Sequence, residues 1–72
     1  MATEARRKGC DQWKHCGDMS DVDAAIFVSS FYSDDDLTVE VRSTDRPGDV
    51  RSLRVKRRTA YEVKELPKQA KE

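Results

Sequence analysis

The chain has 72 residues and no formal net charge, and 39% of its residues are charged while only 36% are apolar. This length allows one domain, and so small a domain buries only about 60% of the surface that its unfolded chain exposes. The longest apolar run, residues 24–28, is far shorter than the roughly 18 residues of a membrane-spanning helix. The charged N-terminus lacks the apolar stretch of a secretory signal, so we expect a cytoplasmic protein with reduced thiols at Cys10 and Cys16.

Charged residues are segregated along the chain. Residues 18–40 contain seven acids and no Lys or Arg, whereas residues 41–72 contain ten basic and five acidic side chains. Blocks of opposite sign can steer a charged partner toward a protein. The alternative is that both blocks only keep a small protein in solution.

Residues 1–20 show neither helical nor strand periodicity, and Gly9 and Gly17 interrupt them. We therefore expect a flexible N-terminal arm over residues 1–20. Its one large apolar side chain, Trp13, either folds back onto the core or anchors a partner.

The segment after this arm begins with a helix-start signal, in which Asp23 stands three residues after Ser20. Residues 25–32 are rich in β-branched and aromatic side chains, which favour strands. Because apolar residues fall on both faces of residues 26–32, the pattern predicts at most one helical turn and then a central buried strand.

Residues 37–57 predict a β-hairpin. Apolar and polar residues alternate over 37–42 and again over 51–57, as in strands with one buried face. Residues 46–49 predict a type II turn, with Pro47 presetting its backbone angle and Gly48 taking the positive φ. The side chains expected to point inward are Leu37, Val39, Val41, Leu53 and Val55.

The C-terminal segment fits two structures. Thr59 and Glu62 form a capping-box pattern and Pro67 would end a helix, so we expect a short helix at 60–66 and a frayed tail at 67–72. Tyr61 and Val63 also continue the alternation of the preceding strand, which keeps a fourth strand as the alternative.

The expected architecture is a small, mostly β, α+β domain over residues 21–66, a three-stranded antiparallel meander with a possible short C-terminal helix. Residues 37–66 resemble the opening strand–turn–strand–helix of the ubiquitin-like fold. The chain has neither the remaining strands nor the C-terminal diglycine of that family, so the resemblance implies a fold for these 30 residues and no function.

We expect neither catalysis nor a cofactor. Nucleophilic catalysis needs a nucleophile, a base and an orienting group in fixed geometry. Cys10, Cys16 and the single histidine, His15, all lie in the expected arm. The acids at 34–36 lie on an exposed turn without an apolar pocket that would raise a carboxyl pKa, and they do not match a calcium loop.

A structural zinc ion needs four ligands at regular spacing. Cys10, His15 and Cys16, with Asp11 or Asp18 as a fourth ligand, give an irregular set. A small zinc-stabilised domain therefore stays an alternative, and no metal site is assigned.

Basic residues are concentrated at 42–58, where arginine suits phosphate and carboxylate groups. On the predicted hairpin, Arg42, Ser52, Arg54 and Lys56 share the outward face, which makes a nucleic-acid-binding module an alternative. Against it, the whole chain is not basic and the aromatic residues lie on another predicted strand, so no base-stacking platform is expected.

The function that we expect is a non-enzymatic, protein-binding regulator that docks on a larger protein or nucleoprotein complex, with no membrane involved. In size and character the chain is analogous to phage-encoded inhibitors of host nucleic-acid machines such as RNA polymerase or a defence complex. The residues expected to contact the partner are Arg6, Arg7, Trp13, Asp34, Asp35, Asp36, Arg42, Arg54, Lys56, Arg57 and Arg58.

Overall fold

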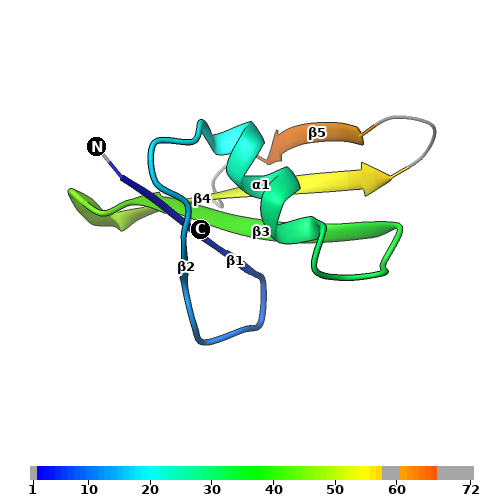
Figure 1. Ribbon diagram of the computed structural model, residues 1–72, viewed down its shortest axis with the longest axis horizontal. Coiled ribbons are helices and arrows are strands. Elements are labelled where there is room, and N and C mark those ends of the chain that lie inside the picture. The colour runs from blue at the N-terminus through cyan, green and yellow to red at the C-terminus, as the bar shows by residue number, and fades with distance from the viewer. Residues whose placement is uncertain (1, 58–60, 67–72) are drawn as a thin grey trace, which may run out of the picture.

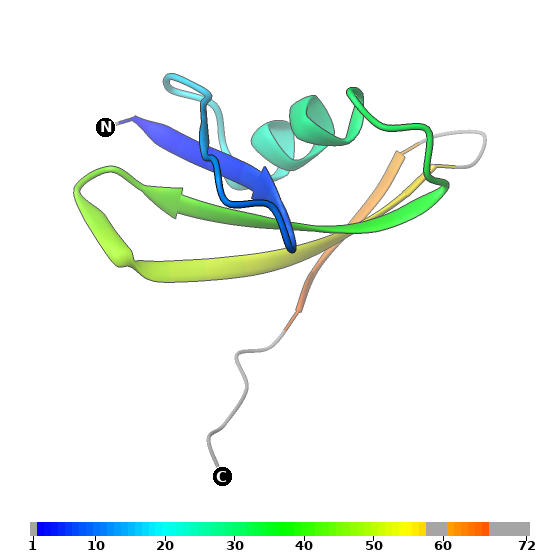
Figure 2. The ribbon, with the colours of Figure 1, turned by 90° about the horizontal axis from the view of Figure 1, so that it is seen from below.

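A computed structural model describes residues 2–57 and 61–66. The described chain forms one antiparallel sheet of five strands in the order β2-β1-β3-β4-β5, with one helix on a single face (Figures 1 and 2). The predicted class, a small and mostly β α+β domain, is confirmed, but the sheet has five strands and the helix lies between β2 and β3. The elements are β1 (Thr3–Arg7), β2 (Lys14–His15), α1 (Asp21–Ser29), β3 (Asp36–Ser43), β4 (Arg46–Arg57) and β5 (Tyr61–Leu66).

The hairpin of β3 and β4 is confirmed, including its inward face. Leu37 pairs with Val55 and Val39 pairs with Leu53, and all four side chains are buried. They form the centre of a core to which β1, the β2–α1 segment and α1 also contribute. The buried members are Ala5, Cys16, Ala24, Ala25, Val28, Leu37, Val39, Val41, Leu53 and Val55.

The predicted turn at 46–49 is wrong. The chain turns at residues 44–45, where Ser43 pairs with Arg46 and the Asp45 N–H donates to Ser43 Oγ at 3.3 Å. Pro47 and Gly48 lie at the irregular start of β4, where the register with β3 shifts, and Gly48 does not have a positive φ. Such an irregular stretch accommodates proline because proline has no N–H for a regular ladder.

The predicted strand at 26–32 is also wrong, because residues 21–29 form α1. The predicted start holds: Ser20 is the N-cap, and its Oγ accepts a hydrogen bond from the Asp23 N–H at 3.2 Å. Ala24, Ala25 and Val28 recur at helical spacing and are all fully buried against the sheet. Burial of this stripe outweighs the weak strand preference of the neighbouring β-branched and aromatic residues.

Ser20→Ala is expected to lower the free energy of unfolding by about 1 kcal/mol, because the substitution removes the N-cap acceptor from a short helix. Urea denaturation followed by circular dichroism measures this change. Ser33→Ala, at an exposed position just beyond the helix, is the matched control and should leave stability nearly unchanged. Equal stability of the two variants would show that the cap contributes nothing.

Residues 1–20 contain two strands, so the expectation that this segment lacks regular structure is wrong. β1 lies between β2 and β3 in the sheet, and Ala5 is fully buried opposite Val41. The Cys16 N–H donates to Thr3 O at 2.7 Å, and the positive φ of Gly17 (64°) turns the chain toward α1. The predicted flexibility of this segment and the domain boundary at residue 21 stay predictions.

The C-terminal segment forms a strand, which was the alternative to the predicted helix. β5 pairs antiparallel with β4, with Val63 opposite Val55, and Val63 packs against the core. The helix predicted at 60–66 is therefore wrong, and the ubiquitin-like order of strand, turn, strand and helix is not present. Thr59, Arg58 and the tail at 67–72 lie outside the described residues.

No helix in the described ranges has the length and apolar character needed to cross a bilayer.

Candidate protein-binding surfaces

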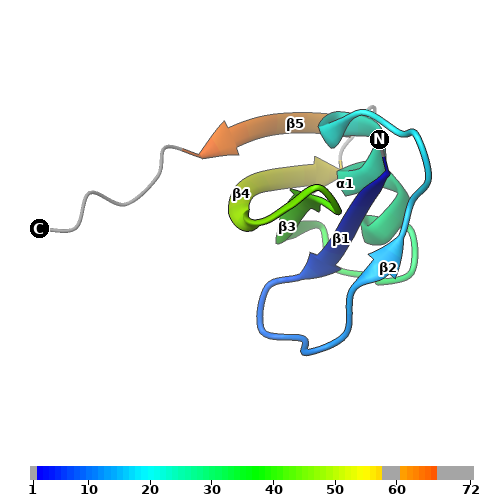
Figure 3. The same cartoon turned by 90° about the vertical axis from the view of Figure 1, so that its left-hand side faces the viewer.

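The sheet has one face against α1 and an opposite face that no described helix or strand covers. Figure 3 shows the sheet curving around the helix, which leaves its convex side open. Strand alternation and register place charged side chains from β1, β3, β4 and β5 on this open side. We call it the charged face, formed by Glu4, Arg6, Asp36, Glu40, Arg42, Arg54, Lys56, Glu62 and Lys64.

Ion pairs between neighbouring strands organise the charged face. Arg6 Nε lies 2.8 Å from Glu40 Oε1, and Arg42 Nε lies 2.9 Å from Glu4 Oε1. Arg54 Nη2 lies 2.6 Å from Asp36 Oδ2, and this hydrogen bond raises the pKa of Arg54. The acidic and basic blocks of the sequence are therefore interleaved in the fold and partly neutralise each other.

Trp13 folds back, but onto arginines of the charged face. Its ring centroid lies 4.3 Å from Arg6 Cζ and 4.1 Å from Arg42 Cζ, and the side chain is half-buried. The expectation that no aromatic side chain lies among the basic residues is therefore wrong, because the β1–β2 loop places Trp13 beside Arg42. Because two guanidinium groups already occupy its surroundings, Trp13 is not an open stacking platform for bases.

Other predicted contact residues meet at the C-terminal end of α1. Arg7 Nη2 lies 2.6 Å from Asp34 Oδ2, and Arg7 Cζ lies 4.8 Å from the Tyr32 ring centroid. Arg57 donates one side-chain hydrogen bond to Tyr32 O, and its backbone N–H donates to Asp35 O at 2.7 Å. These contacts fasten the loop after the helix to β1 and β4.

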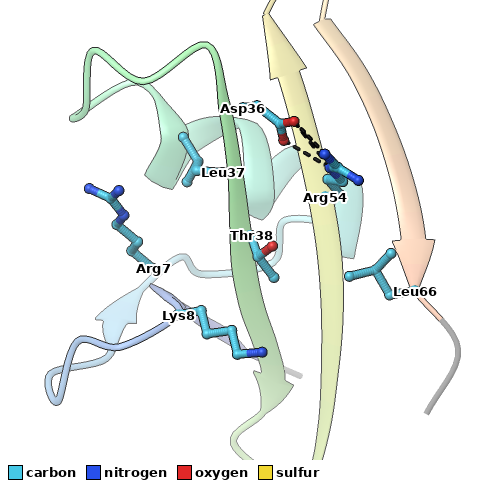
Figure 4. Close-up of a pocket in the computed structure, with 7 residues that line it drawn as sticks. All are labelled: Arg7, Lys8, Asp36, Leu37, Thr38, Arg54 and Leu66. Carbon is cyan, nitrogen blue, oxygen red and sulfur yellow. Dashed lines mark hydrogen bonds and ion pairs between the residues drawn. The ribbon is translucent and has the colours of Figure 1, made fainter. Parts of the chain in front are cut away.

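A shallow groove of about 500 Å³ crosses the sheet beside the Arg54–Asp36 pair (Figure 4). Basic and acidic groups line it together with Thr38 and Leu66, and no nucleophile is paired with a base there. Its chemistry suits a polar side chain of a partner. The full lining is Arg7, Lys8, Asp36, Leu37, Thr38, Arg54 and Leu66.

The residues considered for catalysis or for zinc binding differ in burial and in their contacts. His15 is exposed on β2, Cys16 is buried and Cys10 Sγ lies 3.7 Å from Tyr32 Oη. Burial raises the pKa of the Cys16 thiol, which keeps it protonated and unreactive at neutral pH. Among the described residues, no three or more His, Cys, Asp or Glu side chains form a cluster that could hold a metal ion.

The helix presents an apolar surface that the sequence-based site prediction omitted. Val22 is 46% exposed and Phe31 is 56% exposed, the latter beside Phe27 at a ring-centroid distance of 5.2 Å. Ile26, one turn after Val22, is only half-buried and is not among the side chains packed on the core. Phe27 is half-buried and packs against the core. We call Val22, Ile26, Phe27 and Phe31 the helix patch.

The sequence signal for the helix patch was present but was assigned to a strand. Apolar residues fall on both faces of 26–32, which we interpreted as a strand buried on both sides. In a helix the same composition places Val22 with Ile26, and Phe27 with Phe31, on the two flanks of the buried stripe, whereas Asp23 and Ser30 lie on the side away from the sheet. Figure 2 shows no described element beyond α1 on that side.

Comparisons of the chain with protein families, with curated proteins and with solved structures gave no significant match. The functional argument therefore depends on the chemistry of these two surfaces.

Proposed function

We propose that this protein is a non-enzymatic regulator that docks on a larger protein through the helix patch. One observation carries the proposal: Val22 in α1 and Phe31 just after it are large apolar side chains, yet they are 46% and 56% exposed. Large exposed apolar side chains bordered by polar residues are typical of a protein-binding surface. Burying a Phe or Val side chain against a partner contributes roughly 1.5–3 kcal/mol each.

Charge around the helix patch indicates the partner's chemistry. Asp23 in the first turn and Asp35 after the helix are both exposed and acidic, while the Lys14 ammonium lies 4.7 Å from the Phe31 ring centroid, so the acidic margin is at the Val22 end of the patch. A complementary partner has an apolar surface with a basic margin. Proteins that handle nucleic acid have basic surfaces, which suits an inhibitor of RNA polymerase or of a defence complex, the phage-type function that the sequence favours by analogy.

The charged face supports the nucleic-acid alternative less well. Its three arginines in ion pairs, Arg6, Arg42 and Arg54, already bind carboxylates. A phosphate backbone would have to displace these acids or lie beside them, and both cost binding free energy.

Capture from a cell lysate with two matched surface variants tests the docking surface. Val22→Ser with Phe31→Ser should reduce recovery of the captured protein about tenfold or more, because exposed apolar anchors dominate binding free energy. Arg54→Ala with Lys56→Ala alters the charged face and should retain capture. Circular dichroism checks that both variants are folded.

The reverse pattern, with capture lost only in the charged-face variant, would move the docking surface to the sheet. Recovery of nucleic acid alone by the parent protein would instead favour the nucleic-acid-binding module.

A further inference from the structure

The two edges of the sheet differ in a way that bears on association. β2 forms one edge and has only two residues, which leaves little backbone for pairing with another chain. β5 forms the other edge and has six residues, with no further strand beside it in the described structure. A six-residue edge presents a row of backbone N–H and C=O groups that another strand can pair with.

Lys64 is poorly placed within one chain. It stands opposite Arg54 in the β4–β5 register, so two positive side chains are direct cross-strand neighbours. The carboxylate nearest to Arg54 is Asp36, on the far side of β4, and Lys64 has no ion pair among the described residues. The exposed side chain of Lys64 therefore has a positive neighbour on β4, and its nearest acid on the same face is Glu62, two residues before it on β5.

We propose that β5 pairs edge to edge with β5 of a second copy of this chain, antiparallel and centred on Val63. Directly opposite residues of an antiparallel pair point to the same face and their numbers have a constant sum. This centre places Glu62 opposite Lys64 of the second copy, and two-fold symmetry repeats the pair. Val63 then meets its own copy on the helix side, beside the core that it already contacts.

The sequence of β5 disfavours the other registers. Centres on Glu62, Lys64 or Glu65 place that charged residue opposite itself. Moving the register by one position puts the two helices on opposite faces, and in one of the two directions it also pairs Glu62 with Glu65. Like charges directly opposite destabilise a strand pair, whereas opposite charges stabilise it.

Charges on an edge strand also serve monomers, where they prevent association. In β5 the order of the charges favours pairing over prevention of association, because Glu62 and Lys64 are complementary under two-fold symmetry about Val63. Glu62 would then lie between Lys56 of its own chain and Lys64 of the second copy. Pairing through five residues of β5, 61–65, gives a small interface, so we expect a weak, concentration-dependent dimer.

Sedimentation velocity over a series of concentrations, with the full chain, tests the dimer and its register. The parent should shift from monomer to dimer as concentration rises. K64E and E62K should each stay monomeric, because each places like charges opposite each other twice. An equimolar mixture of the two variants should form a heterodimer, because two lysines then face two glutamates.

K8E is the matched control: it makes the same charge change at an exposed lysine beyond β1 and should dimerise like the parent. The double variant E62K/K64E should also dimerise, which supports the register even if one single variant fails to fold. A parent that stays monomeric at every concentration would overturn the proposal. So would a dimer that K64E leaves intact, or folded single variants that do not associate when mixed. The helix-patch variants should dimerise normally, which separates this inference from the proposed function.

Discussion

Val39→Asp is expected to abolish folding. Val39 is fully buried at the middle of β3, between Arg7 of β1 and Leu53 of β4. An aspartate there would bury a carboxylate beside apolar side chains, and its one basic cross-strand neighbour, Arg7, is already paired with Asp34, so the substitution costs several kcal/mol. The free energy of unfolding of a domain this small is about 4–11 kcal/mol, so the penalty is of the same order as the whole stability.

The control for this variant is a substitution at Thr38, the residue before Val39. Thr38 has its side chain on the charged face, where Arg54 is its cross-strand neighbour. Thr38→Asp should therefore keep a cooperative thermal transition, because its carboxylate is near a positive charge and water. Circular dichroism at 25 °C and on heating compares the two variants. A folded Val39→Asp protein would mean that the inward face of the hairpin is misassigned.

Removal of residues 2–17 is the second change with a large expected effect, and we expect an unfolded product. Without β1, the fully buried Val39 and Val41 would lie on an exposed strand edge. The core against which α1 packs would also lose Ala5, the buried residue of β1. The lost contacts are internal to the sheet, so no rearrangement of the remaining strands replaces them. The fragment should give a collapsed proton–nitrogen NMR spectrum with narrow amide dispersion.

Point variants in β1 separate the strand's role from the effect of shortening the chain. Ala5→Glu puts a charge into the fully buried position and should unfold the protein as the deletion does. Glu4→Gln changes the neighbouring residue on the charged face, removes the ion pair with Arg42 and should cost less than about 1 kcal/mol, because that pair is partly exposed. A well-dispersed spectrum from the deletion product would instead support an independent domain at 21–66.

The β3–β4 hairpin was predictable because its residues alternate and its inward side chains are large. β1 offers the sequence no such signal, since Ala5 is its only buried residue and four polar or charged residues surround it. Its position depends on pairing with Val39–Ser43, residues far along the chain. In α1 the local strand preference pointed the wrong way, because helical burial of small side chains depends on a sheet that the segment itself does not encode.

Sequence reasoning identified charged residues of the candidate site but not their arrangement. It treated Asp34 to Asp36 and the later arginines as opposite blocks, whereas Asp36 is paired with Arg54 and Asp34 with Arg7 of the N-terminal segment. Pairing of this kind is set by tertiary register, which charge counts along the chain do not contain. The helix patch was missed for a related reason: its residues were assigned to a buried strand, and exposure is known only once the helix is placed.

The position of β1 also has a consequence for synthesis on the ribosome. Arg6 and Glu40 are 34 residues apart and yet bonded side by side in the sheet. At a translation rate of about 5–20 residues per second, the first strand emerges about 2–7 seconds before its partner exists. Its charged composition suits this interval, because a segment with one small apolar residue exposes little apolar surface before its partner is made. The same residues that make β1 difficult to recognise in the sequence thus leave the unpaired strand well solvated.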